Sequence, residues 1–100
     1  MVAHRILYAR STRRHFEFLT GREQKAVFDA VDRQLAFEPT LETRNRKRMR
    51  PNPLATWELR IGPLRVYYDI LSEPEPAVLV VAVGVKDRDL IRIGGDVVRL

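Results

Sequence analysis

Arginine and lysine side chains stand in several separate segments of this sequence, and they point to the binding of anions. Arg60 and Arg65 lie on either side of a Gly-Pro turn, and Lys86 and Arg88 follow a long apolar run. Guanidinium groups bind phosphodiester oxygens through paired hydrogen bonds, and a ring such as that of Tyr67 can stack on a base. If the fold brings these side chains together, the surface suits a polynucleotide backbone.

A simpler alternative is open at this point. Glu58 and Asp69 alternate with the same arginines. The charges of Arg60 and Arg65 could therefore be neutralised in exposed cross-strand pairs, worth roughly a few tenths of a kcal/mol each. Composition alone favours this interpretation.

The run RNRKRMR at 44–50 places five cations in seven positions. It lies within residues 38–55, which contain three prolines and no apolar period. We expect these residues to form a long irregular loop, which in a compact domain is either functional or mobile. The loop is predicted to lie beside the cationic surface, where four side chains would contact a polyanion: Arg46, Lys47, Arg48 and Arg50.

Length and composition limit the class of protein. One hundred residues form one domain, here residues 1–100, and a net charge of +5 with a pI near 10.2 attracts polyanions or an acidic protein partner. The absence of cysteine excludes disulfides and thiolate metal sites. The longest apolar run, 77–85, is about half the length of a membrane-spanning helix, and no signal peptide is apparent, so we expect a cytoplasmic protein without a membrane partner.

The first forty residues predict one strand and two helices. Alternation in HRILYARS (4–11) indicates a strand, after which Ser11 can cap a short helix through TRRHFEFL. Thr20 and Glu23 have the spacing of a capping box, so a second helix should begin there and end before Pro39. Its buried stripe recurs at three- and four-residue steps: Val27, Ala30, Val31, Gln34 and Leu35.

The remaining chain predicts strands. Residues 56–71 form two alternating runs joined at Gly62-Pro63, which indicates a β-hairpin, and the apolar run 77–85 suits a central strand. IGGD indicates a turn before a short edge strand in VVRL. The predicted fold is α+β, in the order β-α-α-β-β-β, with both helices on one face of a mainly antiparallel sheet.

The other face of this sheet is where function is expected. If the apolar residues of the hairpin meet the helices, the alternate residues line an uncovered surface: Glu58, Arg60, Arg65, Tyr67 and Asp69.

Two stretches carry a resemblance to a known family. WELRIGPLRVYYDI, followed by VLVVAVGVKDRD, resembles the RelE/ParE superfamily of toxins from bacterial type II toxin–antitoxin systems. The resemblance covers nearly the whole chain and implies a strand, two helices and three strands. It favours a functional cationic surface over simple ion pairs.

The resemblance implies one of two activities and a protein partner. RelE-like members cut messenger RNA on the ribosome without a metal or other cofactor, whereas ParE-like members inhibit DNA gyrase. Both are held inactive by an antitoxin that wraps the toxin. Because the basic surface suits an acidic antitoxin segment as well as RNA, charge does not separate these roles.

The resemblance also implies roles for individual residues. Arg65 matches the arginine beneath the scissile phosphate, Arg60 a basic residue on the preceding strand, and Lys86 another phosphate-binding cation, with Arg88 close by. Glu58 falls where some members carry a lysine assigned to proton transfer, and a carboxylate there could act as the base. Lys47 falls where a related subgroup carries a glutamate base.

The sequence departs from the pattern near its end. Arg92 stands where several RelE-like nucleases use a tyrosine or histidine, and arginine is a poor proton carrier. Glu58, Lys86 or Tyr67 could substitute, or catalysis could rest on positioning and charge. A non-catalytic member that binds RNA or antitoxin is the other alternative. His4 and His15 are expected to be structural or exposed rather than metal ligands.

Overall fold

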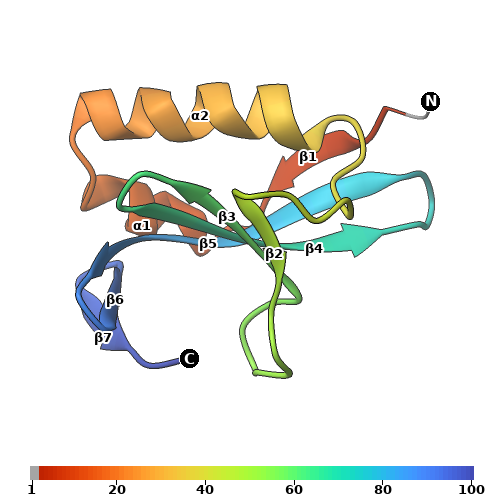
Figure 1. Ribbon diagram of the computed structural model, residues 1–100. Coiled ribbons are helices and arrows are strands. Elements are labelled where there is room, and N and C mark those ends of the chain that lie inside the picture. The colour runs from red at the N-terminus through yellow and green to blue at the C-terminus, as the bar shows by residue number, and fades with distance from the viewer. Residues whose placement is uncertain (1–2) are drawn as a thin grey trace.

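The computed structural model describes residues 3–100, which form two helices and a seven-stranded sheet (Figure 1). The elements in chain order are β1 (Arg5–Tyr8), α1 (Thr12–Glu17), α2 (Gly21–Leu35), β2 (Arg46–Arg48), β3 (Trp57–Ile61), β4 (Leu64–Leu71), β5 (Ala77–Asp87), β6 (Leu90–Ile93) and β7 (Asp96–Val98).

The sheet is antiparallel except for one strand. Its strands run in the order β2-β3-β4-β5-β6-β7, and β1 pairs in parallel with residues 77–80 of β5. The predicted α+β fold, with two helices on a mainly antiparallel sheet, is confirmed. The structure adds strands that the sequence pattern did not predict, namely β2 and β6, and it confirms an edge strand in the last residues.

The predicted capping box starts α2. The Glu23 N–H donates to Thr20 Oγ1 at 3.1 Å, and the Thr20 N–H donates to Glu23 Oε1 at 2.9 Å. The stripe of α2 faces the sheet, with Val27 and Val31 fully buried. This burial, rather than helix propensity, holds α2 in place.

The short helix α1 fills a gap along one edge of β5. The pairing of β1 ends at Val80 and that of β6 begins at Gly84, so the intervening backbone has no strand partner on that edge. Ser11 Oγ donates to the Val81 carbonyl at 3.2 Å, and the Val83 N–H donates to His15 Nδ1 at 3.3 Å. The expected side-chain cap at Ser11 is therefore wrong, because its hydroxyl satisfies β5 instead.

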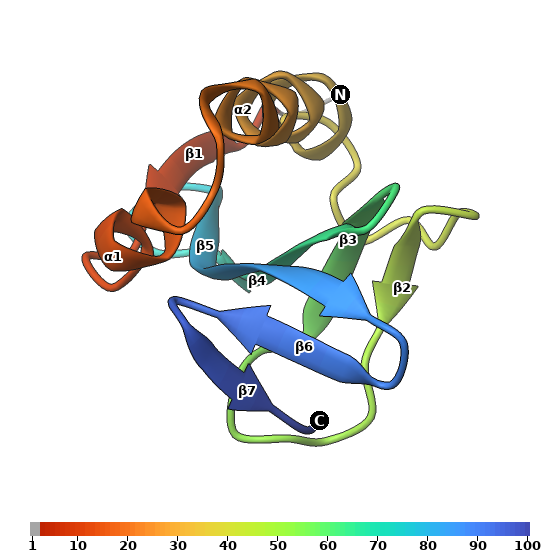
Figure 2. The same cartoon turned by 90° about the vertical axis from the view of Figure 1, so that its left-hand side faces the viewer.

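Both faces of the sheet carry a hydrophobic core. On the helix side, α2 packs on a cluster that includes Leu59, Val66 and Tyr68. On the opposite side, the β6–β7 strands and the 49–55 segment fold under the sheet (Figure 2). A smaller cluster forms there from Ala55, Tyr67, Ala82, Ile91 and Ile93. The prediction of an uncovered face is therefore wrong for the middle of the sheet.

The basic segment is less irregular than expected. Residues 46–48 form β2, which pairs antiparallel with β3 through Arg46↔Leu59, Lys47↔Glu58 and Arg48↔Trp57. An Arg-Lys-Arg strand has no apolar alternation, so only its pairing with a distant segment identifies it.

The contact between His15 and β5 predicts a pH dependence of stability. Burial and the neighbouring Arg14 charge lower the pKa of His15, while Asp96 opposes them. The unfolded chain therefore binds this proton more readily, so the stabilisation is complete above the ordinary value of 6.5 and is lost as the pH falls through the folded pKa. The free energy of unfolding, measured by urea titration, should fall from about pH 7 to about pH 5.

The variant His15→Asn provides the control. Asn Oδ1 can accept the Val83 N–H without titrating, so the fall over the same pH range should be smaller than in the wild type. An equal fall in both proteins would show that other groups cause it.

Candidate cationic pocket

One groove on the sheet face opposite the helices brings together most of the predicted site residues. It has a volume of about 670 Å³ and is called the cationic pocket below. Its lining residues come from β2 to the end of the described chain: Lys47, Arg48, Met49, Arg50, Pro51, Asn52, Glu58, Arg60, Arg65, Tyr67, Lys86, Asp89, Ile91 and Leu100.

Strand register aligns the central cations. Arg60 and Arg65 are Cα partners across the β3–β4 hairpin, and Arg65 is the partner of Gly84 on β5. Like charges directly opposite each other on a sheet are destabilising. A Cβ at Gly84 would collide with the Arg92 carbonyl and the Ile93 side chain. The glycine thus lets β6 approach closely while leaving no side chain beside Arg65.

The two arginines are held in different ways. Arg60 Nε donates to Glu58 Oε1 at 2.7 Å, and the Glu58 side chain is 13% exposed against 46% for Arg60. Arg65 Nη1 donates to the carbonyls of Gly62 at 2.6 Å and Leu64 at 2.9 Å. The hairpin turn therefore orients the Arg65 guanidinium and leaves its other N–H groups for an anion.

Two lysines complete the cationic walls. Lys47 on β2 is the Cα partner of Glu58, so it lies on the same face of the sheet. Lys86 stands near the end of β5, where its backbone N–H donates to the Pro63 carbonyl at 2.8 Å and ties the strand to the hairpin turn. Neighbouring strands therefore direct their charges toward one pocket.

Tyr67 lies within this cluster, but not as expected. The predicted exposed ring for base stacking is wrong, because the side chain is fully buried in the smaller core. Its hydroxyl makes no hydrogen bond of good geometry among the described residues, although it lies near enough to the Glu58 carboxylate for a weak one to contribute to its raised pKa. Burial, and after it the charge of Glu58, raise the pKa of Tyr67, while Arg65 and Arg60 oppose the rise. The hydroxyl is therefore buried at the base of the pocket, where the charges of Glu58, Arg65 and Arg60 influence it.

Two of the predicted RNA-binding arginines lie on the helix side of the sheet. Arg46 Nη1 donates to the carbonyls of Gln34 at 2.6 Å and Glu38 at 3.2 Å, which fastens β2 to the end of α2. Arg92 is the Cα partner of Val85 and lines a separate hollow beside α1. The expectation that Arg46 and Arg92 face the RNA groove is therefore wrong, because strand alternation points them the other way.

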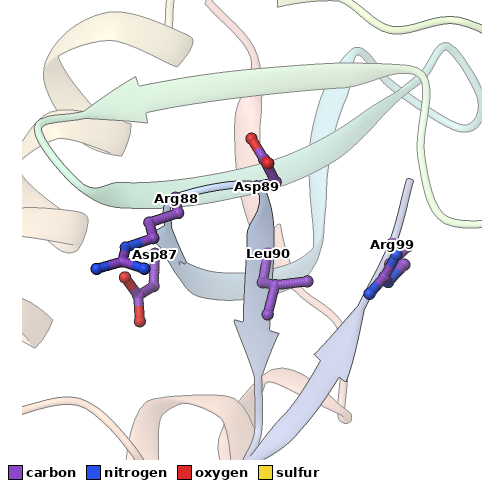
Figure 3. A pocket seen from close by; sticks show the side chains of 5 residues that line it. All are labelled: Asp87, Arg88, Asp89, Leu90 and Arg99. Atoms are coloured by element: carbon purple, nitrogen blue, oxygen red, sulfur yellow. The ribbon is translucent and has the colours of Figure 1, made fainter.

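Arg88 lies outside the pocket. It occupies the β5–β6 turn with φ +58°, and its side chain lies beside Asp87, while Asp89 projects in another direction (Figure 3). The positive φ turns the chain sharply at this point. Arg88 is two residues from Lys86 in the sequence, but only Lys86 lines the pocket.

The pocket wall formed by residues 49–52 depends on the Asn52 side chain, a role that the sequence analysis did not predict. Asn52 Oδ1 accepts the N–H groups of Leu54 at 2.8 Å and Ala55 at 3.1 Å, and Nδ2 donates to the carbonyls of Arg50 at 2.7 Å and Ala55 at 2.9 Å. The Pro-Asn-Pro sequence is a turn signal that could have indicated it. A turn fixed in this way holds Arg50 and Met49 at the pocket edge.

Within residues 3–100, no group of three or more His, Cys, Asp or Glu side chains is arranged to hold a metal ion. No helix in this part of the chain has the length and apolar character needed to cross a membrane.

Comparison with solved structures gives a clear match. A chain in the crystal structure of the toxin–antitoxin complex RelBE2 from Mycobacterium tuberculosis aligns with a TM-score of 0.73 and 27% sequence identity. The alignment covers 86% of the present chain and 94% of the matched chain. Comparison with protein-family models and with curated protein sequences gives no match.

This match confirms the resemblance that residues 57–70 and 78–89 indicate. The chain is similar to RelE-type toxins, and its two helices on an open antiparallel sheet form a RelE-like fold. The similarity extends over most of both chains and is therefore not confined to a local motif.

Replacing Asn52 tests how the pocket wall is built. Asn52→Ala should lower the free energy of unfolding by about 1–3 kcal/mol, because partly buried backbone groups of the turn lose their partners. Chemical denaturation measures this change. Asn45→Ala is the matched control, since Asn45 is exposed and its contacts among residues 3–100 are made by its backbone. Equal effects of the two substitutions would contradict the role of Asn52.

Proposed function

We propose that this protein is the toxin of a bacterial type II toxin–antitoxin system and that it inhibits translation by cutting messenger RNA on the ribosome. The RelE-like fold and the match to a chain of the RelBE2 complex support the toxin assignment. The gathering of Arg60, Arg65 and Lys86 around one pocket supports cleavage of RNA.

The proposed chemistry follows from these side chains. Attack of the RNA 2′-hydroxyl on the adjacent phosphorus places extra negative charge on the phosphoryl oxygens. The guanidinium of Arg65, fixed by the turn carbonyls, and the Lys86 ammonium stabilise that charge. Neighbouring phosphates are bound at the rim by Lys47, Arg48 and Arg50, so the affinity for RNA depends on the salt concentration.

A cognate antitoxin is the second proposed partner. The same cationic pocket suits an acidic polypeptide segment, which would cover it and prevent access by RNA. Such a partner would keep the toxin inactive in the cytoplasm, where its proposed targets, the ribosome and messenger RNA, are found.

Inhibition of DNA gyrase is the second candidate function. The position of Arg92 favours this function. Arg92 points away from the cationic pocket, so this position of β6 contributes no side chain to the pocket that could carry a proton. In that case translation would continue, while supercoiling stops and cleaved DNA accumulates. A member that only binds RNA or antitoxin would do neither.

A cell-free translation reaction separates these functions. Adding the wild-type protein should create new 5′ ends on the message, mapped by primer extension, while a parallel gyrase assay remains unchanged. Arg65→Ala should reduce cleavage by at least about 100-fold, because charge stabilisation of the phosphoryl group is lost.

Arg92→Ala is the matched control. It removes the same charge from the opposite face of the sheet, so cleavage should stay close to the wild-type rate. Thermal unfolding of both variants checks that they fold. Inhibited gyrase with an intact message would overturn the proposal in favour of the second candidate, and no effect in either assay would indicate a binding protein.

A further inference from the structure

Resting on the nuclease function proposed above, we propose that Asp89 is a specificity-determining residue of the cationic pocket. Its carboxylate accepts hydrogen bonds from the Watson–Crick edge of a base beside the cut and thereby selects guanine. The preferred substrate is RNA with a guanosine at one fixed position next to the scissile phosphate.

The charge of Asp89 opposes that of the pocket which it lines. The lining includes two acidic side chains, and the other one, Glu58, is bound by Arg60 at 2.7 Å. Asp89 is exposed, and none of the ion pairs within residues 3–100 includes it. Its carboxylate repels phosphates without neutralising a described cation. It therefore favours RNA binding only by contacting a part of the nucleotide that carries hydrogen-bond donors, which is the base.

The turn between β5 and β6 places Asp89 next to the proposed phosphate site. Lys86, which is proposed to bind the phosphate, and Ile91 are Cα partners on either side of this turn, and all three residues line the pocket. The Asp89 side chain projects away from those of Asp87 and Arg88 (Figure 3). Because a nucleotide carries its base close to its phosphate, a phosphate at Lys86 brings an adjacent base to Asp89.

Apolar side chains in the same pocket provide a surface for the flat face of that base. Met49, Ile91 and Leu100 belong to the lining. Ile91 is 8% exposed and fixed in the smaller core, whereas Leu100 is 50% exposed. Apolar side chains of this kind pack on base faces in other nucleotide pockets and leave the base edge for polar contacts.

The other polar residues of the lining are not available to select a base by accepting hydrogen bonds. Both ends of the Asn52 amide are engaged within the 49–55 turn. Tyr67 is fully buried, and Glu58 is held by Arg60. Arginine and lysine side chains only donate. Asp89 is therefore the exposed side-chain acceptor among the lining residues.

The chemistry of a carboxylate determines which base it prefers. A carboxylate accepts hydrogen bonds and donates none. Guanine presents two adjacent donors, N1–H and N2–H, which match the two carboxylate oxygens. Adenine and cytosine present an acceptor nitrogen beside their amino group, and uracil presents a carbonyl on each side of N3–H, so each directs a lone pair at the carboxylate. Paired hydrogen bonds of this kind discriminate between bases by roughly 10- to 100-fold.

The test is single-turnover cleavage on purified ribosomes, with messages that differ only in one nucleotide flanking the mapped cut. The wild type should cut the guanosine message about 10- to 100-fold faster than those with adenosine, cytidine or uridine at the selected position. Inosine lacks the N2 amino group, so its message should be cut at an intermediate rate. Asp89→Asn replaces one acceptor with a donor, so the preference should move to adenosine and cytidine, which present one donor beside one acceptor.

Asp87→Asn is the matched control. It removes the same charge from the same turn, but Asp87 lies beside Arg88 and does not line the cationic pocket (Figure 3). Both substitutions reduce the repulsion of RNA, whereas only Asp89→Asn should change the preferred base. An equal change in both variants would overturn the role of Asp89. A guanosine preference that persists in Asp89→Asn would also overturn it, because the ribosome would then make the selection.

A binding measurement separates base selection from cleavage. Short RNA oligonucleotides with 2′-methoxy groups cannot be cut, and their affinity for the isolated protein can be followed by fluorescence anisotropy. The wild type should bind the guanosine form at least about fivefold more tightly than the inosine form, and Asp89→Asn should not distinguish them. Equal affinities for the wild type would overturn the selection by Asp89. A guanosine preference in binding, with no message cut by the wild type, would support the role of Asp89 and overturn the nuclease function alone.

Discussion

The two-residue alternation of β3, β4 and β5 is the constraint on which the rest of the molecule depends. It directs one set of side chains into the core beneath α2 and the other set toward the smaller core and the cationic pocket. A slip of one residue in the pairing would exchange these sets and bury Arg60 and Arg65 under the helix. The packing of Leu59, Val66 and Tyr68 against α2 therefore also fixes the positions of the charges.

This arrangement works against local stability in the pocket. Arg60 and Arg65 face each other across the hairpin, and Arg65 has a glycine as its other neighbour. Glu58 offsets part of the repulsion through its contact with Arg60. Conflicts of this kind between local preference and global fold are expected where a surface serves binding or catalysis.

The sequence predicts the elements whose signals are local. The capping box at Thr20, the hairpin turn at Gly62 and the apolar central strand each follow from a few adjacent residues, and the structure has all of them. The directions of the charges on β3 and β4 follow from alternation in the same way.

Features that depend on distant segments were not predictable in this way. β2 is a strand only because β3 lies beside it, and the direction of Arg46 depends on that register. Tyr67 is buried because β6, β7 and the 49–55 turn fold beneath the sheet, and nothing near Tyr67 in the sequence indicates this. Such long-range contacts also set the side of the sheet on which Arg92 lies.

The parallel pairing of β1 with β5 bears on how the protein is made. β1 is synthesised before β5, the strand with which it pairs, and α1 also contacts the same strand edge. The helices cannot close over a finished core until then, since contacts distant in sequence form late. Lys86 lies on the same strand, so the cationic pocket is complete only after β5 has been synthesised.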